Sequence, residues 1–96
     1  MVTHMVMFQF EDPLRAAEAV EKLLSMRGKM DSVLEIEAGV DFTRSERSFE
    51  VGLITRHRTE SDLRSYRLDP IHLEVAAFVK LHASGSAAVD FKSANE

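Results

Sequence analysis

The sequence predicts a single α+β domain in which helices cover one face of an antiparallel sheet. Two observations carry this prediction. The apolar residues change period several times along the chain, from the alternation of a strand to the wider spacing of a helix. The chain has 96 residues, 45% of them apolar and 29% charged. That length and that balance are typical of one globular domain with one core.

The first predicted element is a strand over residues 2–10. Because side chains alternate along a strand, its even-numbered residues share one face and its odd-numbered residues share the other. Both faces carry apolar side chains, so we expect both to be buried. The helices of so short a chain cover only one of them. The sequence therefore predicts a homodimer through the sheet face that carries Met5 and Met7.

A helix and two further strands follow. The helix is expected to begin at Pro13, with Asp12 as its N-cap, and to end at Gly28. Alternation then returns twice, over residues 33–40 and 49–56, with a short polar loop between them. These two strands are predicted to form a hairpin.

Two helices and a last strand complete the chain. Thr59 opens a short helix with a pattern that resembles a capping box. The pair Asp69 and Pro70 interrupts this helix and starts another, which runs to about His82. Residues 84–86 end it, and residues 87–91 supply the final strand.

The resulting order, β-α-β-β-α-α-β, is the ferredoxin-like arrangement of a four-stranded antiparallel sheet with helices on one face. We expect residues 1–96 to form one domain, with 92–96 as a polar tail.

Several classes of function are disfavoured by the composition. The formal charge is −4, from 12 basic and 16 acidic residues, and the basic residues are scattered, which argues against nucleic-acid binding. No apolar run approaches the roughly 18 residues that span a bilayer. The start of the chain lacks the pattern of an export signal, so we expect a cytoplasmic protein. The histidines are not spaced as a helical metal-binding pair, and we predict neither a metal site nor a cofactor; a cation at the dimer interface remains open.

Three short motifs stand out along the chain. They are THMVMF at residues 3–8, DPIHL at 69–73 and VDF at 89–91. Together they resemble the stress-responsive α/β-barrel family, Dabb, in order and in spacing over nearly the whole chain. The resemblance implies a dimeric α+β barrel in which the sheets of two subunits pair. It also implies that the reaction is unassigned, as in most bacterial members, although some plant members are polyketide cyclases that act without a cofactor.

Few polar residues face the pocket expected between the sheet and the helices. His4 lies among apolar neighbours on the helix side of its strand, and His72 lies near the free N–H groups that begin its helix, which disfavour the imidazolium form. Tyr66, the only tyrosine, lies on the preceding short helix. We predict His72 as a general base, with His4 or Tyr66 donating to a developing oxyanion. The resemblance favours this prediction because cyclase-type members have two histidines and a tyrosine at these positions.

The rest of the predicted pocket is apolar and suits a small apolar or aromatic ligand. Cyclase-type members place further polar groups on the third strand and first helix, where this chain has Val51 and Leu23. The ligand-binding residues predicted for this pocket are Val6, Phe8, Leu23, Val51, Leu53 and Phe78.

Three functions remain open at this point. The chain binds a small apolar ligand, or it is a cyclase-like or isomerase-like enzyme with His72 as base, or it is a structural stress protein without catalysis. A histidine on an apolar face is more often a hydrogen-bonded core residue than a catalyst. His57 and His82, which lie among polar neighbours, are predicted to be surface residues without a role in the site.

Overall fold

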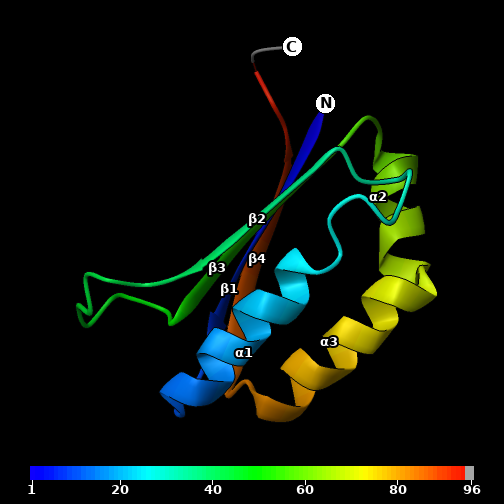
Figure 1. Cartoon of the computed structure of the whole chain (residues 1–96). Helices are drawn as coiled ribbons and strands as arrows, with labels where there is room; N and C mark the ends of the chain where they lie inside the picture. Colours follow the sequence, from blue (N-terminus) through cyan, green and yellow to red (C-terminus); the bar gives the residue numbers. More distant parts are fainter. Residues whose placement is uncertain (95–96) are drawn as a thin grey trace.

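The computed structural model describes residues 1–94 and has the predicted order of elements. Its three helices all lie on one side of a four-stranded antiparallel sheet (Figure 1), which has the strand order β2-β3-β1-β4. The predicted ferredoxin-like fold and the predicted hairpin of the second and third strands are therefore confirmed. The elements are β1 (Val2–Gln9), α1 (Pro13–Leu24), β2 (Glu35–Val40), β3 (Val51–His57), α2 (Glu60–Leu68), α3 (Pro70–His82) and β4 (Gly85–Lys92).

Each helix begins at the cap that the sequence places there. The side chains of Asp12, Thr59 and Asp69 accept hydrogen bonds from backbone N–H groups two or three residues later, at 2.9, 3.0 and 2.9 Å. These bonds satisfy donors that have no partner inside the helix. The bend at Asp69 separates α2 from α3, because its extended backbone ends one helix while Pro70 begins the next.

The boundaries of some elements differ from the prediction. Helix α1 ends at Leu24 and not at Gly28, whose φ of 73° instead forms a turn in the following loop. Gly85 and Ser86, predicted as a loop, belong to β4 because their backbone pairs with the end of β1. Of the predicted tail, Lys92 still belongs to β4, and residues 95–96 lie outside the described part of the chain.

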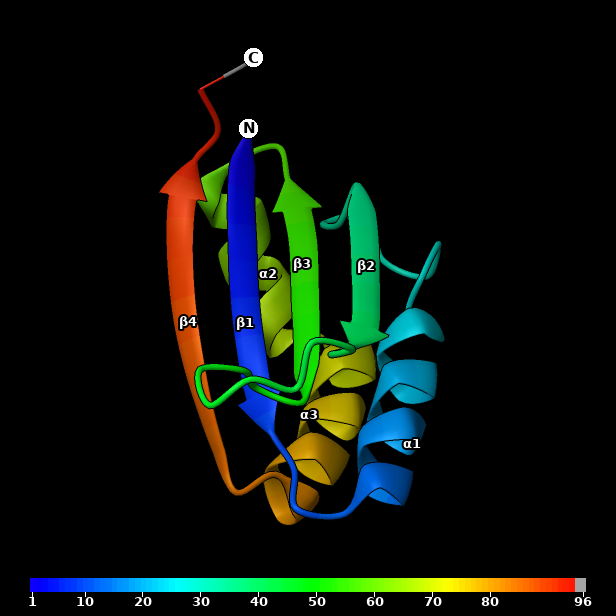
Figure 2. The same cartoon turned by 90° about the vertical axis from the view of Figure 1, so that its left-hand side faces the viewer.

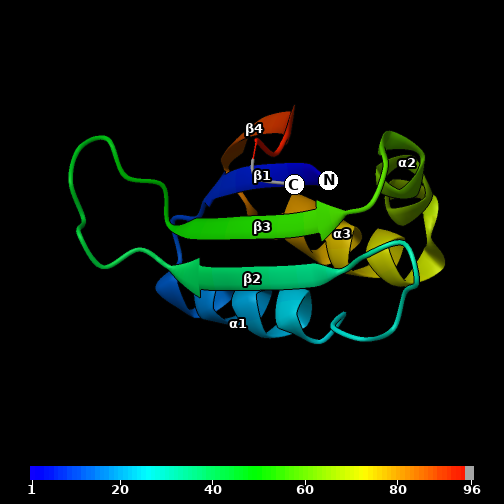
Figure 3. The same ribbon diagram turned by 90° about the horizontal axis from the view of Figure 1, so that it is seen from above.

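The core lies between the sheet and the helices. As predicted, the even-numbered residues of β1 face the helices, together with the odd-numbered residues of β3. Seen from above, α1 lies beneath β2, and the loop between β2 and β3 extends beyond the helices (Figure 3). The buried apolar residues include Val2, Val6, Phe10, Ala16, Ala19, Leu23, Ile36, Val51, Leu53, Leu63, Val75 and Val79.

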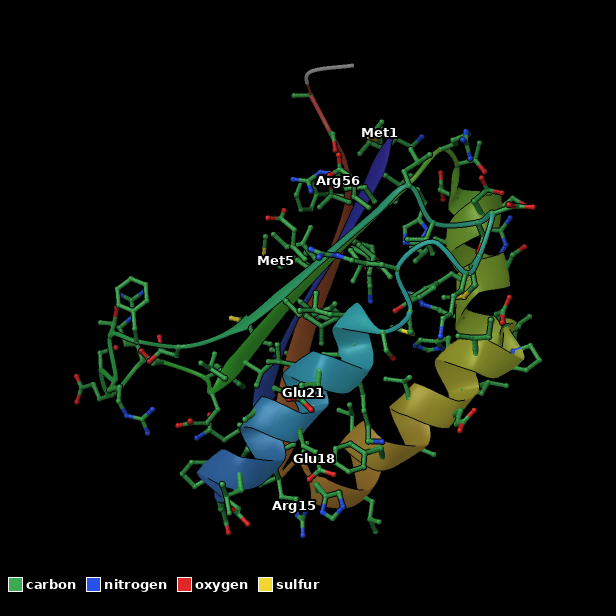
Figure 4. The ribbon with its side chains drawn as sticks, in the orientation of Figure 1. Met1, Met5, Arg15, Glu18, Glu21 and Arg56 are labelled. Carbon is green, nitrogen blue, oxygen red and sulfur yellow. The ribbon has the colours of Figure 1, made fainter. Side chains whose placement is uncertain are left out.

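The opposite face of the sheet has no helix over it (Figure 2). Met5 and Arg56 point away from the helices on this side (Figure 4), and Met7, Val89 and Phe91 are substantially exposed. We call this surface the outer face. Within residues 1–94, no helix is long and apolar enough to cross a membrane. The cytoplasmic location stays a prediction.

Candidate functional site

A cavity of about 590 Å³ lies between the helix side of the sheet and α3. The three predicted catalytic candidates, His4 from β1, Tyr66 from α2 and His72 from α3, all line it. Its volume falls in the range of small-molecule sites. Most of the other lining side chains are apolar, including Val6, Phe8, Leu23, Leu53, Val75 and Val79.

Helix α3 supplies one long wall of the cavity. Lining residues recur along it at positions 72, 75, 76, 79, 80 and 83. This spacing of three or four places them on one stripe of the helix. The stripe begins at His72, in the first turn, and continues past Lys80, in the last turn.

His4 belongs to a chain of charged and polar groups that runs from β1 through the neighbouring strand β4 to α2. It lies directly opposite Asp90 in the pairing of β1 with β4, and its Nδ1 is 2.5 Å from a carboxylate oxygen of Asp90. Arg67 of α2 donates to the other carboxylate oxygen. Burial alone raises the pKa of Asp90, but the hydrogen bonds from His4 and Arg67 outweigh it and lower that pKa. The ionised carboxylate only accepts, so His4 carries its proton on Nδ1.

His72 is held in the state that a general base requires. Its Nδ1 donates to the backbone carbonyl of Arg67 at 3.1 Å, and a carbonyl oxygen can only accept. The Nε2 atom therefore carries the lone pair in the neutral ring. Burial lowers the pKa of His72, and its bond to that carbonyl offsets this only in part. At neutral pH the ring is consequently neutral, with Nε2 unprotonated.

Tyr66 lies among three imidazole rings. Its ring centroid is 4.4 Å from that of His72, 5.2 Å from that of His57 and 6.2 Å from that of His4. The residue is fully buried, and its hydroxyl has no hydrogen-bond partner among residues 1–94. Burial raises the pKa of Tyr66 to about 12, so the hydroxyl keeps its proton and can act as a hydrogen-bond donor.

The prediction that His57 is a surface residue is wrong. Strand β3 continues to His57, which places the ring on the same helix-facing side as Thr55, and both residues are fully buried. The Nδ1 of His57 donates to the carbonyl of Ser32 at 2.7 Å, and its Nε2 accepts from the hydroxyl of Thr55 at 2.7 Å. Burial lowers the pKa of His57. Both nitrogens are occupied, so His57 supports the ring of Tyr66 without a free atom for chemistry.

The remaining predicted residues divide between the cavity and its surroundings. Val6, Phe8, Leu23 and Leu53 line the cavity, as noted above. Val51 instead lies in the packed core, and Phe78 stacks on His82 at 4.6 Å, outside the lining.

From the sequence we predicted no role in the site for Asp90 or Arg67. Asp90 carried a usable signal, because an acidic residue interrupts the helix-facing alternation of its strand two positions after Ala88. Arg67 carried no such signal, because its pairing with Asp90 depends on how α2 packs against the sheet. Among the described residues, no three His, Cys, Asp or Glu side chains come close enough to hold a metal ion.

The comparison with family models decides the relationship. The model of the Stress responsive A/B Barrel Domain, Dabb, matches residues 2–93. The chain belongs to the Dabb family. The predicted resemblance is thus confirmed, and the His4–Asp90 pair joins two of the three motifs that carried it. No curated protein matches this Dabb chain.

Solved structures share the fold of this Dabb domain at low sequence identity. A dimeric protein of unknown function from Bacteroides fragilis is 19% identical, with a TM-score of 0.84 over 96% of this chain and 95% of that one. A hydroxynitrile lyase from Passiflora edulis is 12% identical, with a TM-score of 0.82 over 99% and 94%. SnoaB, a cofactor-independent oxygenase from Streptomyces nogalater, is 11% identical, with a TM-score of 0.77 over 99% and 94%. At these identities the likeness establishes the fold alone.

Proposed function

We propose that this Dabb domain binds a small, largely apolar ketone and moves a proton at the carbon beside its carbonyl group, without a cofactor. The observation that carries the proposal is the hydroxyl of Tyr66, which is buried without a hydrogen-bond partner among residues 1–94, on a residue that lines the cavity and packs its ring against His72. A buried donor without an acceptor costs about 1–3 kcal/mol. A ligand that brings a carbonyl oxygen to this hydroxyl removes that cost.

The proton transfer uses the two residues in different roles. The ketone oxygen accepts a hydrogen bond from Tyr66, and Nε2 of His72 takes a proton from the adjacent carbon. The C–H bond breaks, an N–H bond forms, and the electron pair moves to the oxygen as an enolate. The Tyr66 hydroxyl stabilises that charge because it is a fixed donor in a mostly apolar site. Return of the proton to the same or another carbon completes an exchange or an isomerisation.

His4 contacts the ligand in this scheme, and Asp90 has a positioning role behind it. Asp90 holds its ring by Nδ1, so Nε2 is left to meet a polar group of the ligand. Arg67 fixes the carboxylate of Asp90 in turn. A rigid polar wall of this kind restricts the poses that an apolar ligand can take.

We also propose that the protein is a homodimer through its outer face. Met7, Val89 and Phe91 lie exposed on that face, on neighbouring strands, and contiguous apolar surface of this kind is typical of an interface. The structural neighbour from Bacteroides fragilis is described as dimeric. In such a dimer the two cavities lie on opposite sides of the paired sheets, and each subunit carries a whole site.

The proposal is tested by hydrogen exchange. Acetophenone and benzylacetone are incubated with the protein in D₂O, and loss of the signal from the hydrogens beside the carbonyl is followed by NMR. We expect the wild-type protein to accelerate exchange and His72→Ala to lower the rate about 10²–10⁴-fold. His82→Ala is the matched control, because it removes a histidine of the same helix that lies outside the cavity, and it should keep the rate.

The outcomes separate the open alternatives. Exchange that survives in His72→Ala at the wild-type rate contradicts the assignment of the base. Ketone binding without exchange in the wild-type protein leaves a carrier of small ligands, the first function that the sequence left open. If the wild-type protein shows neither ketone binding nor exchange, the purely structural function is favoured. The volume of the cavity argues against that function.

A further inference from the structure

We propose that the ligand of this cavity is an anion, an apolar ketone with a carboxylate at the end remote from His72. This inference rests on the proposed function and names the class of its ligand. The lining includes two cations, Arg67 and Lys80, and no acidic side chain. The chain as a whole has 16 acidic and 12 basic residues. The charge of the cavity wall is therefore opposite in sign to that of the protein.

The two cations differ in what they contact. Arg67 donates to Asp90, which also binds His4, so the charges of Arg67 and Asp90 cancel. Lys80 is exposed and has no ion pair within residues 1–94. One positive charge at the cavity thus remains uncompensated. A ligand with one negative charge neutralises it, and the match favours that ligand over a neutral analogue.

Lys80 lies at the end of the cavity opposite the proposed base. His72 and Lys80 are eight residues apart on the lining stripe of α3. At 1.5 Å per residue, this separates them by about 12 Å along the helix axis. The ketone bound at Tyr66 and the carboxylate bound near Lys80 must therefore belong to an elongated molecule.

The surroundings of Lys80 suit a carboxylate. Ser84 and Ser86, which follow the end of α3, also line the cavity, and Ser86 lies opposite Phe8 in the pairing of β4 with β1, on the helix side of the sheet. A hydroxyl and an ammonium group are both donors, as a carboxylate requires. Between this end and His72 the wall is apolar, with Val75 and Val79 on α3. An alkyl chain between the ketone and the carboxylate fits that wall.

The probes are ω-benzoylalkanoates of increasing chain length, each compared with its methyl ester. Their dissociation constants for the full chain are measured by NMR titration. We expect the acid to bind about fivefold more tightly than the ester once the chain is long enough to reach Lys80. Lys80→Gln should remove this preference. Lys29→Gln, which removes the same charge from an equally exposed lysine outside the cavity lining, should keep it.

Two results overturn the inference. One is an ester that binds the wild-type protein as tightly as its acid at every chain length, and the other is a preference for the acid that Lys80→Gln reduces no more than Lys29→Gln does. If the esters still bind, and Tyr66→Phe weakens their binding, the proposed function is supported and only the anionic class of ligand is refuted. If neither acids nor esters bind the wild-type protein, both proposals fall.

Discussion

Replacing Tyr66 with phenylalanine should make the free protein more stable but should slow the proposed proton exchange. The substitution keeps the ring among the three histidines and removes only the hydroxyl, which is buried without a partner within residues 1–94. An unsatisfied buried polar group costs about 1–3 kcal/mol. A gain of about 1 kcal/mol in the free energy of unfolding raises the Tm of a domain this size by about 4–8 °C.

Thermal unfolding at a fixed subunit concentration measures the first effect, since the stability of a dimer depends on concentration. The matched control is Thr55→Val, which removes a buried hydroxyl that does have a partner, Nε2 of His57. It should destabilise the protein by about 1–3 kcal/mol. In the exchange assay, Tyr66→Phe should lower the rate about 10²–10³-fold, as expected for loss of one oxyanion donor. A Tyr66→Phe protein that is less stable than wild type, or that exchanges as fast, would refute the reasoning.

Three further outcomes are expected. Burial lowers the pKa of His57 in the folded chain, so the unfolded chain binds a proton at His57 at a higher pH than the folded chain does. The free energy of unfolding should therefore fall as the pH drops below about 6.5. Urea unfolding at about pH 7.5 and about pH 5.5 should show a smaller loss of this free energy for His57→Gln than for wild type. Asp90→Ala frees the ring of His4 and should slow exchange about tenfold or more, while circular dichroism shows the fold intact; an unchanged rate contradicts the positioning role. Val89→Asp on the outer face should produce monomers in sedimentation velocity, whereas Leu81→Asp, equally a change at an exposed apolar residue, should leave a dimer.

The order of the elements was predictable because local signals agree with the final packing. Asp12, Thr59 and Asp69 each cap the helix that follows them, and period-two alternation predicted which face of β1 meets the helices. Boundaries were less predictable. Gly85 looks like a loop residue in the sequence, but the ladder between β1 and β4 extends the last strand through it. The ends of a strand are set by the neighbouring strand with which it pairs, and that strand lies far away in the sequence.

The candidate site was predictable only in part. The sequence predicted that His4, Tyr66 and His72 meet in one pocket, because alternation places His4 on the helix side of its strand and the other two lie six residues apart on neighbouring helices. It did not predict the burial of His57, since its polar neighbours on either side suggest a solvated strand end. One extra residue of β3 turns this ring inward, where the backbone carbonyl of Ser32 accepts a hydrogen bond from its Nδ1. Contacts of that kind depend on tertiary packing, and local pattern carries no signal for them.

The central claim is that His72 is a neutral base whose Nε2 lies free in the cavity. Nitrogen NMR of the protein labelled with ¹⁵N-histidine tests it most directly, with His72 assigned by its loss in His72→Ala. At neutral pH the account predicts a neutral ring with its proton on Nδ1, and a shift of the Nε2 signal when benzylacetone is added. A His72 ring that is an imidazolium at neutral pH, or that carries its proton on Nε2, would contradict the account.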